Sequence, residues 1–453
     1  MSEAFFMSVA HRGAEMIIRG GRVVDPATGT DAVRDLRIEG GSVVAIEPSI
    51  VPSPGETVYE VDGLLVSPGW IDAHAHLRDP GVTWKEDFAT GARAALAGGI
   101  TRTCAMPNTN PPVDTAARVR DAIERSAPYG LAVHPVGAIS VGRAGEELAP
   151  LEEMAAAGAV GFSDDGDSTL SVDVMRRALR MSKDLGLPIM VHCEDPLLAR
   201  GGSMHRGAVS REIGDPGIPA EAEESFIARD ISLAEETGGW LHVLHVSTVR
   251  GAMLVAEAQR RGVRVTAEVM THHMLLTDEW VAGRRRFAGE ATVDDLGRID
   301  PLAKVNPPLR PEADALGLRE MLRTGVFAFV ATDHAPHADR DKPAYLPDAA
   351  FGMSGFELAI PSMAKLVEAG VLSWPEAIAQ FTCNPARTLR LPGGSLSIGA
   401  RADITVIDSE RAWLVSKETL YSKSKNTPLL GMRVRGRAVL TIAGGEVLHD
   451  ELG

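Results

Sequence analysis

The chain has little cysteine, no long apolar run and no excess of positive charge. Its three cysteines are scattered and include no CxxC pair, which excludes a disulfide framework and a structural zinc built from paired thiolates, and indicates a reducing compartment. No stretch approaches the ~20 consecutive apolar residues of a membrane span, and the interrupted apolar run near the N-terminus does not predict a signal peptide. The net charge of −15 argues against a nucleic-acid or anionic-membrane partner. We therefore expect a cytoplasmic protein.

The 453 residues, 45% hydrophobic and 24% charged, divide into two kinds of sequence. Residues 1–63 and 392–453 alternate apolar and polar residues between Gly and Pro turns, which predicts a small β-sandwich-like domain built from both ends of the chain. Residues 64–391 alternate short apolar runs with amphipathic helical stretches, which predicts a (β/α)8 barrel of the TIM type. The expected fold class is α/β, with the barrel inserted into a β-rich domain.

Polar residues of the metal-ligand type recur where the apolar runs of the predicted barrel end. Sites in this fold lie at the carboxyl ends of the strands, so these residues are expected to meet. His74 and His76 lie two residues apart and would share one face of a strand. The other residues at such positions are Asn108, Asp164, Asp165, His192, His245, Asp333 and His337.

Four histidines and two aspartates among these residues predict a site for two zinc ions, or for manganese or cobalt in their place. A two-metal site needs a bridging ligand, which can be an aspartate or a carbamylated lysine. Because no lysine occurs between Lys85 and Lys183, the fourth strand end offers only Asp164 and Asp165. We favour Asp165, with Asp164 as the alternative, although the pair on its own fits a solvated loop better than a ligand.

Other polar groups near these strand ends suit an anionic substrate. Arg78 shares the face of the first two histidines and offers a fixed guanidinium group. Asn108 and His337 are expected to hold a substrate carboxylate together with it. Asp333 is expected to carry a proton to the leaving nitrogen. Two further residues are expected to lie outside the site. Arg102 is expected at the surface, and His242 is expected to point away from the barrel mouth.

Motifs along nearly the whole chain resemble those of the cyclic amidohydrolases, and within them the dihydroorotases. The matching segments include PGWIDAHAHLRDPG, AMPNTNPPVDT, GFSDDG, VHCED, KVNPPLR, ATDHAPH, FGMSGFE and YSKSKNTP. The resemblance implies the reversible cyclisation of N-carbamoyl-L-aspartate to L-dihydroorotate, with loss of water, in pyrimidine biosynthesis. The aspartate in GFSDDG resembles a bacterial subgroup that lacks the carbamylated lysine.

The resemblance also implies roles for particular residues. In the hydrolytic direction a metal-bridging hydroxide would attack the ring carbonyl, and Asp333 would act as the general acid and base. The implied metal ligands are His74, His76, Asp165, His192, His245 and Asp333. The implied substrate-binding residues are Arg78, Asn108, Asn306, His337, Gly352, Met353, Ser354 and Gly355. Thr271, where many relatives have proline, and the FGMSGFE loop depart from the family pattern.

Two other interpretations stay open. The chain can be another cyclic amidohydrolase, namely a dihydropyrimidinase, hydantoinase or allantoinase, although the missing lysine and the set of Arg78, Asn108 and His337 argue against this. It can also be a non-catalytic, dihydroorotase-like partner of aspartate carbamoyltransferase, a group expected to lose metal ligands that this chain keeps. A homodimer is expected, and an active enzyme can still associate with the carbamoyltransferase.

Overall fold

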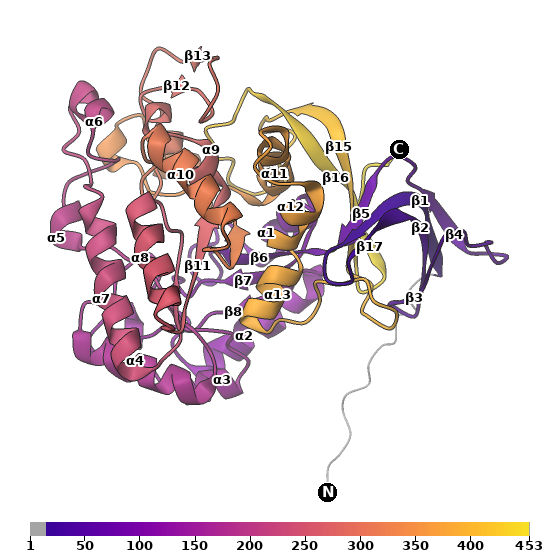
Figure 1. Ribbon diagram of the computed structural model, residues 1–453, viewed down its shortest axis with the longest axis horizontal. Helices are drawn as coiled ribbons and strands as arrows, with labels where there is room; N and C mark the ends of the chain where they lie inside the picture. Colours follow the sequence, from indigo (N-terminus) through magenta and orange to yellow (C-terminus); the bar gives the residue numbers. More distant parts are fainter. Residues whose placement is uncertain (1–14, 453) are drawn as a thin grey trace, which may run out of the picture.

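The computed structural model describes residues 15–452, and the interpretation that the N-terminus carries no signal peptide falls on residues outside this range. Figure 1 shows two parts side by side: helices surround a barrel on the left, and a twisted sheet made by both ends of the chain lies on the right. Within the described range, no helix is both long enough and apolar enough to cross a membrane.

An eight-stranded sheet joins the two ends of the chain. Its order is β17-β16-β15-β5-β1-β2-β3, with β4 paired to β1. The central β5 runs parallel to β1 and antiparallel to β15, so that Val66 lies opposite both Val23 and Val406. All three valines are fully buried in the core of the sheet. The strands are Met16–Asp25 (β1), Thr30–Glu39 (β2), Ser42–Glu47 (β3), Thr57–Glu60 (β4), Leu65–Pro68 (β5), Ile404–Leu414 (β15), Arg433–Ala443 (β16) and Glu446–Asp450 (β17).

Parallel strands and three isolated bridges close a barrel in the middle of the chain. The ladders run β6-β7-β8 and β9-β10-β11-β14. Phe162 stands in for the fourth strand, because it bridges Gly137 after β8 and Ile189 in β9, and a bridge between Ala75 and His334 closes the ring. This arrangement confirms the predicted (β/α)8 fold. The strands are Trp70–Ala75 (β6), Ile100–Ala105 (β7), Ala132–Pro135 (β8), Ile189–Val191 (β9), Leu241–Val243 (β10), Val265–Met270 (β11) and Phe329–Ala331 (β14).

Helices cover the outside of the barrel, each burying one face. In α4, Val174, Ala178 and Ser182 are buried at a spacing of four residues, as an amphipathic helix requires. Ser171 caps this helix by accepting a hydrogen bond from the Val174 N–H, and Gly186 ends it in the left-handed conformation with φ 68°. The α-helices are Phe88–Ala97 (α1), Ala116–Ser126 (α2), Leu151–Ala156 (α3), Val172–Leu185 (α4), Pro196–Ala199 (α5), Ala208–Ile213 (α6), Glu221–Thr237 (α7), Val249–Arg260 (α8), Thr271–Leu275 (α9), Glu312–Arg323 (α10), Ala359–Glu368 (α11), Trp374–Gln380 (α12) and Cys383–Leu389 (α13). The short strands Arg284–Arg285 (β12) and Asp294–Asp295 (β13) pair as an antiparallel hairpin.

A buried ion pair connects the barrel to the sheet. Arg102 in β7 is only 5% exposed, and its Nη2 donates to Asp403 Oδ2 over 2.6 Å. The expectation that Arg102 lies at the surface is therefore wrong. The acidic partner stands 301 residues further along the chain, just before β15, so local sequence holds no sign of the pair.

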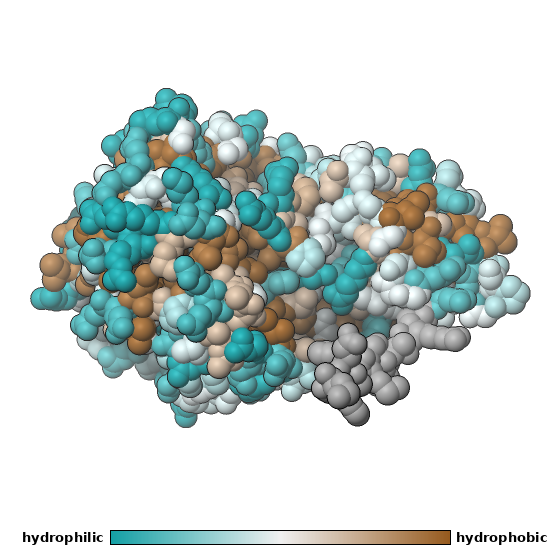
Figure 2. Space-filling view, turned by 90° about the horizontal axis from the view of Figure 1, so that it is seen from below, coloured by the Kyte–Doolittle hydropathy of each residue, from teal (hydrophilic) through white to brown (hydrophobic). Residues whose placement is uncertain are grey.

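The outer surface is mixed in polarity. Figure 2 shows hydrophilic residues over much of one face, with apolar residues scattered between them. Exposed large hydrophobic residues include Val51, Leu197 and Ile398, which belong to different segments. Single exposed apolar residues are usual on folded proteins, so these residues do not mark a binding surface.

Candidate metal and substrate site

The six residues predicted as metal ligands converge at the carboxyl ends of the barrel strands. Each is at most 6% exposed. They lie in or shortly after β6 (His74 and His76), the Phe162 bridge (Asp165), β9 (His192), β10 (His245) and β14 (Asp333).

Their potential donor atoms form two overlapping groups. One comprises His74, Asp165 and His245, the other His74, His76 and Asp333, and within each group the donor atoms lie within 4.8 Å of one another. His192 joins the first group, since its Nδ1 lies 3.0 Å from His245 Nε2. Imidazole and carboxylate donors without a thiolate suit a divalent metal such as zinc.

An unpartnered buried atom supports the fit of a cation to this cluster. His74 Nε2 is fully buried and has no hydrogen-bond partner among residues 15–452. It lies 3.8 Å from Asp165 Oδ2 and 3.6 Å from Asp333 Oδ1, too far for a hydrogen bond. A metal ion among these atoms would satisfy the nitrogen and both carboxylates at once.

The geometry distinguishes the two adjacent aspartates of the fourth strand end. The carboxylate of Asp164 accepts hydrogen bonds from the Ile139 and Ser140 N–H groups and from the Ser140 and Thr169 hydroxyls. Asp165 instead faces the histidines, with Oδ1 3.3 Å from His245 Nε2. Burial raises the pKa of Asp165, but the neighbouring histidines outweigh it and hold the pKa well below the usual range. Asp164 shapes the loop, and Asp165 is free to face a cation.

Three site residues adopt a backbone conformation that side chains usually avoid. Arg78, His245 and Asp333 have φ values of 61°, 34° and 49°, in the left-handed region. Such conformations cost about 1–3 kcal/mol each and persist where the surrounding structure imposes them. All three residues shortly follow barrel strands, at the end where the predicted ligands converge.

A buried glutamate that the sequence motifs did not identify forms a hydrogen bond with His74. Glu268 in β11 is fully buried, and its Oε1 lies 2.6 Å from His74 Nδ1. Its Oε2 lies 3.4 Å from His242 Nε2, and His242 Nδ1 lies 2.8 Å from the Thr266 hydroxyl. Burial raises the pKa of Glu268, but His74 and His242 outweigh it and hold the pKa at about 2. One signal was available, because a charged residue inside the apolar run of β11 requires a buried partner.

The predicted substrate-binding side chains surround the same point. Asn108 Oδ1 lies 2.7 Å from His76 Nδ1, and Asn306 Nδ2 lies 3.3 Å from His192 Nε2. Both amides therefore contact an imidazole that is itself a predicted ligand. Arg78 donates to the Pro336 carbonyl, and its Nη2 lies 3.3 Å from His337 Nε2.

The loop Gly352–Gly355 is fixed beside these residues by its own backbone. The N–H groups of Gly352, Ser354 and Gly355 donate to the Lys304 carbonyl, the Asn426 carbonyl and His334 Nδ1. The Met353 carbonyl accepts from the Ala335 N–H over 2.8 Å. The loop is thereby tied to the segment that follows β14.

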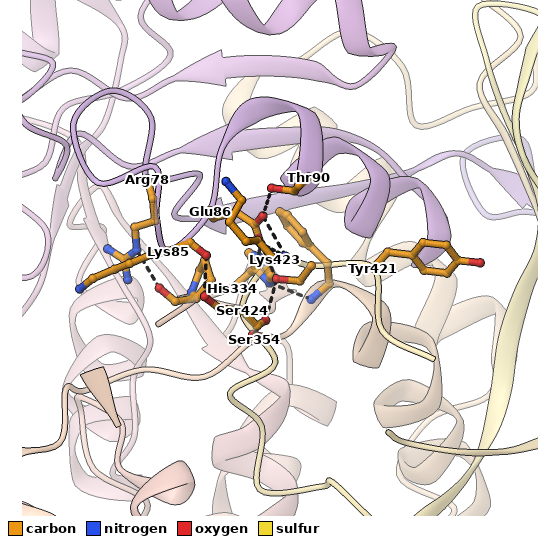
Figure 3. A network of polar contacts seen from close by, with 12 residues as sticks. Arg78, Lys85, Glu86, Thr90, His334, Ser354, Tyr421, Lys423 and Ser424 are labelled. Atoms are coloured by element: carbon orange, nitrogen blue, oxygen red, sulfur yellow. Dashed lines mark hydrogen bonds and ion pairs between the residues drawn. The ribbon is translucent and has the colours of Figure 1, made fainter. Parts of the chain in front are cut away.

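A C-terminal segment to which the motifs assigned no role joins a polar network with Glu86 and Ser354 (Figure 3). Glu86, fully buried, accepts hydrogen bonds from the Thr90 and Ser422 hydroxyls and from the Lys423 N–H. The Ser354 hydroxyl oxygen also lies 2.9 Å from the Ser424 carbonyl oxygen. These contacts hold residues 422–424 against the barrel mouth.

Asn426 connects this segment to two predicted substrate-binding elements. Its Oδ1 accepts from the His337 N–H over 2.9 Å and from the Ser354 hydroxyl over 2.8 Å. Its Nδ2 donates to the carbonyls of Ala335 and Gly352. One amide side chain, 2% exposed, thus fixes the spacing between the loop after β14 and the Gly352–Gly355 loop.

Comparisons with known proteins agree with this geometry. Residues 65–448 match the sequence model of the Amidohydrolase family. The dihydroorotase of Anaeromyxobacter dehalogenans is 44% identical over 437 residues, which cover 96% of this chain and 98% of that protein. The dihydroorotase of a Geobacter species is 42% identical over 436 residues, with 96% and 99% covered.

Solved structures confirm the fold. The L-hydantoinase of Arthrobacter aurescens superimposes with a TM-score of 0.83 at 24% identity, over 97% of this chain and 96% of that one. The dihydropyrimidinase of Brevibacillus agri gives a TM-score of 0.79 at 22% identity, over 96% and 95%. The barrel and the His–Asp cluster define a metal-dependent hydrolase, and the chain belongs to the amidohydrolase family. Within that family it groups with the dihydroorotases, which confirms the predicted enzyme class.

Proposed function

We propose that this chain is a dihydroorotase that interconverts N-carbamoyl-L-aspartate and L-dihydroorotate in pyrimidine biosynthesis. One observation carries the choice of an anionic substrate. Arg78 is 9% exposed and sits beside the metal-ligand cluster, and within residues 15–452 it has no carboxylate at ion-pair distance. A buried guanidinium without an anion is costly, and the carboxylate that both substrates carry would supply the missing partner.

The cluster would hold two zinc ions, and Asp165 rather than Asp164 would be among the ligands. The proposed ligands are His74, His76, Asp165, His192, His245 and Asp333. When bound, such ions polarise a carbonyl oxygen and lower the pKa of a bound water. Glu268 would orient His74 by accepting the hydrogen of its Nδ1, so that Nε2 presents its lone pair to the site.

Asp333 moves the proton in the proposed reaction. In the hydrolytic direction its carboxylate takes a proton from the attacking water and delivers it to the ring nitrogen as the C–N bond breaks. In the synthetic direction it takes a proton from the amide nitrogen of carbamoyl aspartate as this nitrogen attacks the side-chain carboxylate. It then passes that proton to the departing oxygen, which takes one more proton from solvent and leaves as water. Its Oδ1 lies 3.0 Å from His76 Nε2, and the left-handed backbone aims the carboxylate into the site.

The side chains around the metal ligands would orient the substrate by binding its carboxylate and its ring. Arg78 and His337 would bind the carboxylate that does not react, while Asn108 and Asn306 would contact it or the ring. The loop residues Gly352, Met353, Ser354 and Gly355 would lie against the ring. Dihydrouracil and hydantoin lack this carboxylate, so the same side chains would disfavour them.

The proposal is tested by measuring hydrolysis of L-dihydroorotate through the loss of the ring's ultraviolet absorbance. The metal content of the same protein sample is measured by elemental analysis. We expect hydrolysis with one to two zinc ions per chain, abolished by a chelator. Metal-replete protein that is inactive on dihydroorotate but active on hydantoin, dihydrouracil or allantoin would contradict it. Protein with neither metal nor activity would support a non-catalytic partner of aspartate carbamoyltransferase instead.

The setting of the enzyme is proposed on chemical grounds. Cys104, Cys193 and Cys383 are free thiols, which supports a reducing, cytoplasmic location. A homodimer, association with aspartate carbamoyltransferase, and the domain limits at residues 63/64 and 391/392 stay predictions.

A further inference from the structure

His337 lies between two cations that come from the segment after β6. Lys85 Nζ is 3.0 Å from His337 Nδ1, and Arg78 Nη2 is 3.3 Å from His337 Nε2. His337 is 7% exposed, and the side chain of Lys85 is 18% exposed. In Figure 3 Arg78 and Lys85 extend to the same side of the network, away from Thr90 and Tyr421. Lys85 begins the segment KEDFATGARAALAGGIT, and the family resemblance assigns this lysine no role.

The contacts of His337 with Arg78 and Lys85 contain more hydrogen-bond donors than acceptors. A neutral imidazole has one N–H donor and one acceptor nitrogen, whereas ammonium and guanidinium groups only donate. Burial and the charges of Arg78 and Lys85 lower the pKa of His337, so its ring is neutral. Only one of the two contacts can then be a hydrogen bond, and the other places two donors face to face.

The shorter contact identifies the hydrogen bond. If Lys85 donates to Nδ1, the hydrogen of His337 is on Nε2. Arg78 Nη2 and His337 Nε2 then both direct hydrogens into the same space, which fits an oxygen of a carboxylate.

The local charge points to the same conclusion. Lys85 and Arg78 bring two positive charges into a largely buried space. Within the described part of the chain, the carboxylate that comes within ion-pair distance of Lys85 is Asp341, at 3.9 Å, and it already accepts from the Ala338 N–H. Buried charge of one sign requires an anion, although the protein as a whole carries a net charge of −15.

We propose that Lys85 is a positioning and specificity-determining residue of the substrate carboxylate site. Its ammonium group donates to His337 Nδ1, which fixes the hydrogen on Nε2, and its charge adds to that of Arg78. The carboxylate concerned is the one that dihydroorotate and carbamoyl aspartate share and that does not react. The proposal in this form rests on the proposed function.

Kinetics of Lys85→Met against Lys417→Met test the role. Lys417 is a matched control because its side chain is 54% exposed and pairs with Asp339, so its removal costs the same charge without touching His337. A hydrogen bond between a charged and a neutral group is worth about 1.5–3 kcal/mol, so we expect KM for L-dihydroorotate to rise roughly 10- to 100-fold in Lys85→Met. The value of kcat should change little, Lys417→Met should leave KM unaltered, and Lys85→Arg should restore part of the loss. An unchanged KM, or an equal rise in both methionine variants, would overturn the proposal.

Nitrogen NMR of the histidine side chains gives a second readout that a merely structural role would not move. With the His337 signals assigned by their loss in His337→Gln, the wild type should carry hydrogen on Nε2, and Lys85→Met should show a mixture of both tautomers. An Nδ1–H tautomer in the wild type would refute the assigned hydrogen bond. Failure of the wild type to turn over dihydroorotate would refute the proposed function alone, because the tautomer measurement decides the role of Lys85 independently of turnover.

Discussion

Replacing Glu268 with glutamine removes one negative charge from beneath the candidate metal site while keeping the size of the side chain. In the wild type the carboxylate accepts from His74 Nδ1 over 2.6 Å and contacts His242 Nε2 over 3.4 Å. Glutamine can still accept from one of these rings, but without the charge that raises the basicity of His74 as a ligand. We therefore expect the substitution to weaken metal binding rather than to unfold the barrel.

The magnitude follows from the strength of the bond that changes. A hydrogen bond to a charged group contributes about 1.5–3 kcal/mol, against roughly 0.5–1.5 kcal/mol for a neutral one. The difference is on the order of 1.4 kcal/mol, which corresponds to about a tenfold loss. Loss of carboxylate partners behind metal-ligating histidines typically costs about 10- to 100-fold. Glu268→Gln should lie near the lower end of this range, and Glu268→Ala, which leaves a cavity and no acceptor, near the upper end.

The assay is competition for zinc between the protein and a chromophoric chelator, combined with kcat/KM for dihydroorotate. Glu410→Gln is the control, because it removes the same charge from a side chain that is 78% exposed. Zinc affinity and kcat/KM within twofold of the wild type in Glu268→Gln would refute the role assigned to this carboxylate. An equal loss in Glu410→Gln would mean that net charge, and not the contact with His74, is responsible.

Three further predictions follow from single contacts. Asp333→Asn should keep at least one metal ion by elemental analysis but lose most turnover, about 100-fold or more; retained activity would exclude the acid–base role. Asn426→Ala leaves the His337 N–H and the Gly352 carbonyl without their hydrogen-bond partner. An unsatisfied buried group costs about 1–3 kcal/mol, so the melting temperature should fall and KM should rise several-fold. An unaltered KM would contradict the positioning role of Asn426. Burial, with the charge of a neighbouring lysine, lowers the pKa of Lys342 to about 7. Between about pH 7 and 10 the unfolded chain therefore binds a proton that the folded chain does not, and stability rises with pH. The melting temperature of the wild type should climb more steeply over this window than that of Lys342→Met, and parallel slopes would be the contrary result.

Much of the fold and of the candidate site was predictable from local pattern. The spacing of two between His74 and His76 puts both rings on one side of a strand, and the alternation of apolar runs with amphipathic helices predicts the barrel. In a parallel barrel every strand delivers its carboxyl end to the same mouth. Polar residues that follow apolar runs are therefore brought together whatever their distance along the chain.

The contacts that complete the site could not be predicted from local sequence patterns. The sequence favours Asp165 but leaves Asp164 as an alternative, and the hydrogen bonds that occupy the Asp164 carboxylate separate the two. Glu268 reaches His74 across 194 residues, and Lys85 reaches His337 across 252. Such pairs depend on which strand ends and loops become neighbours once the ring closes, and on which buried polar atoms are left without partners. Periodicity determined which residues face the barrel mouth, whereas closure of the barrel decided which of them touch.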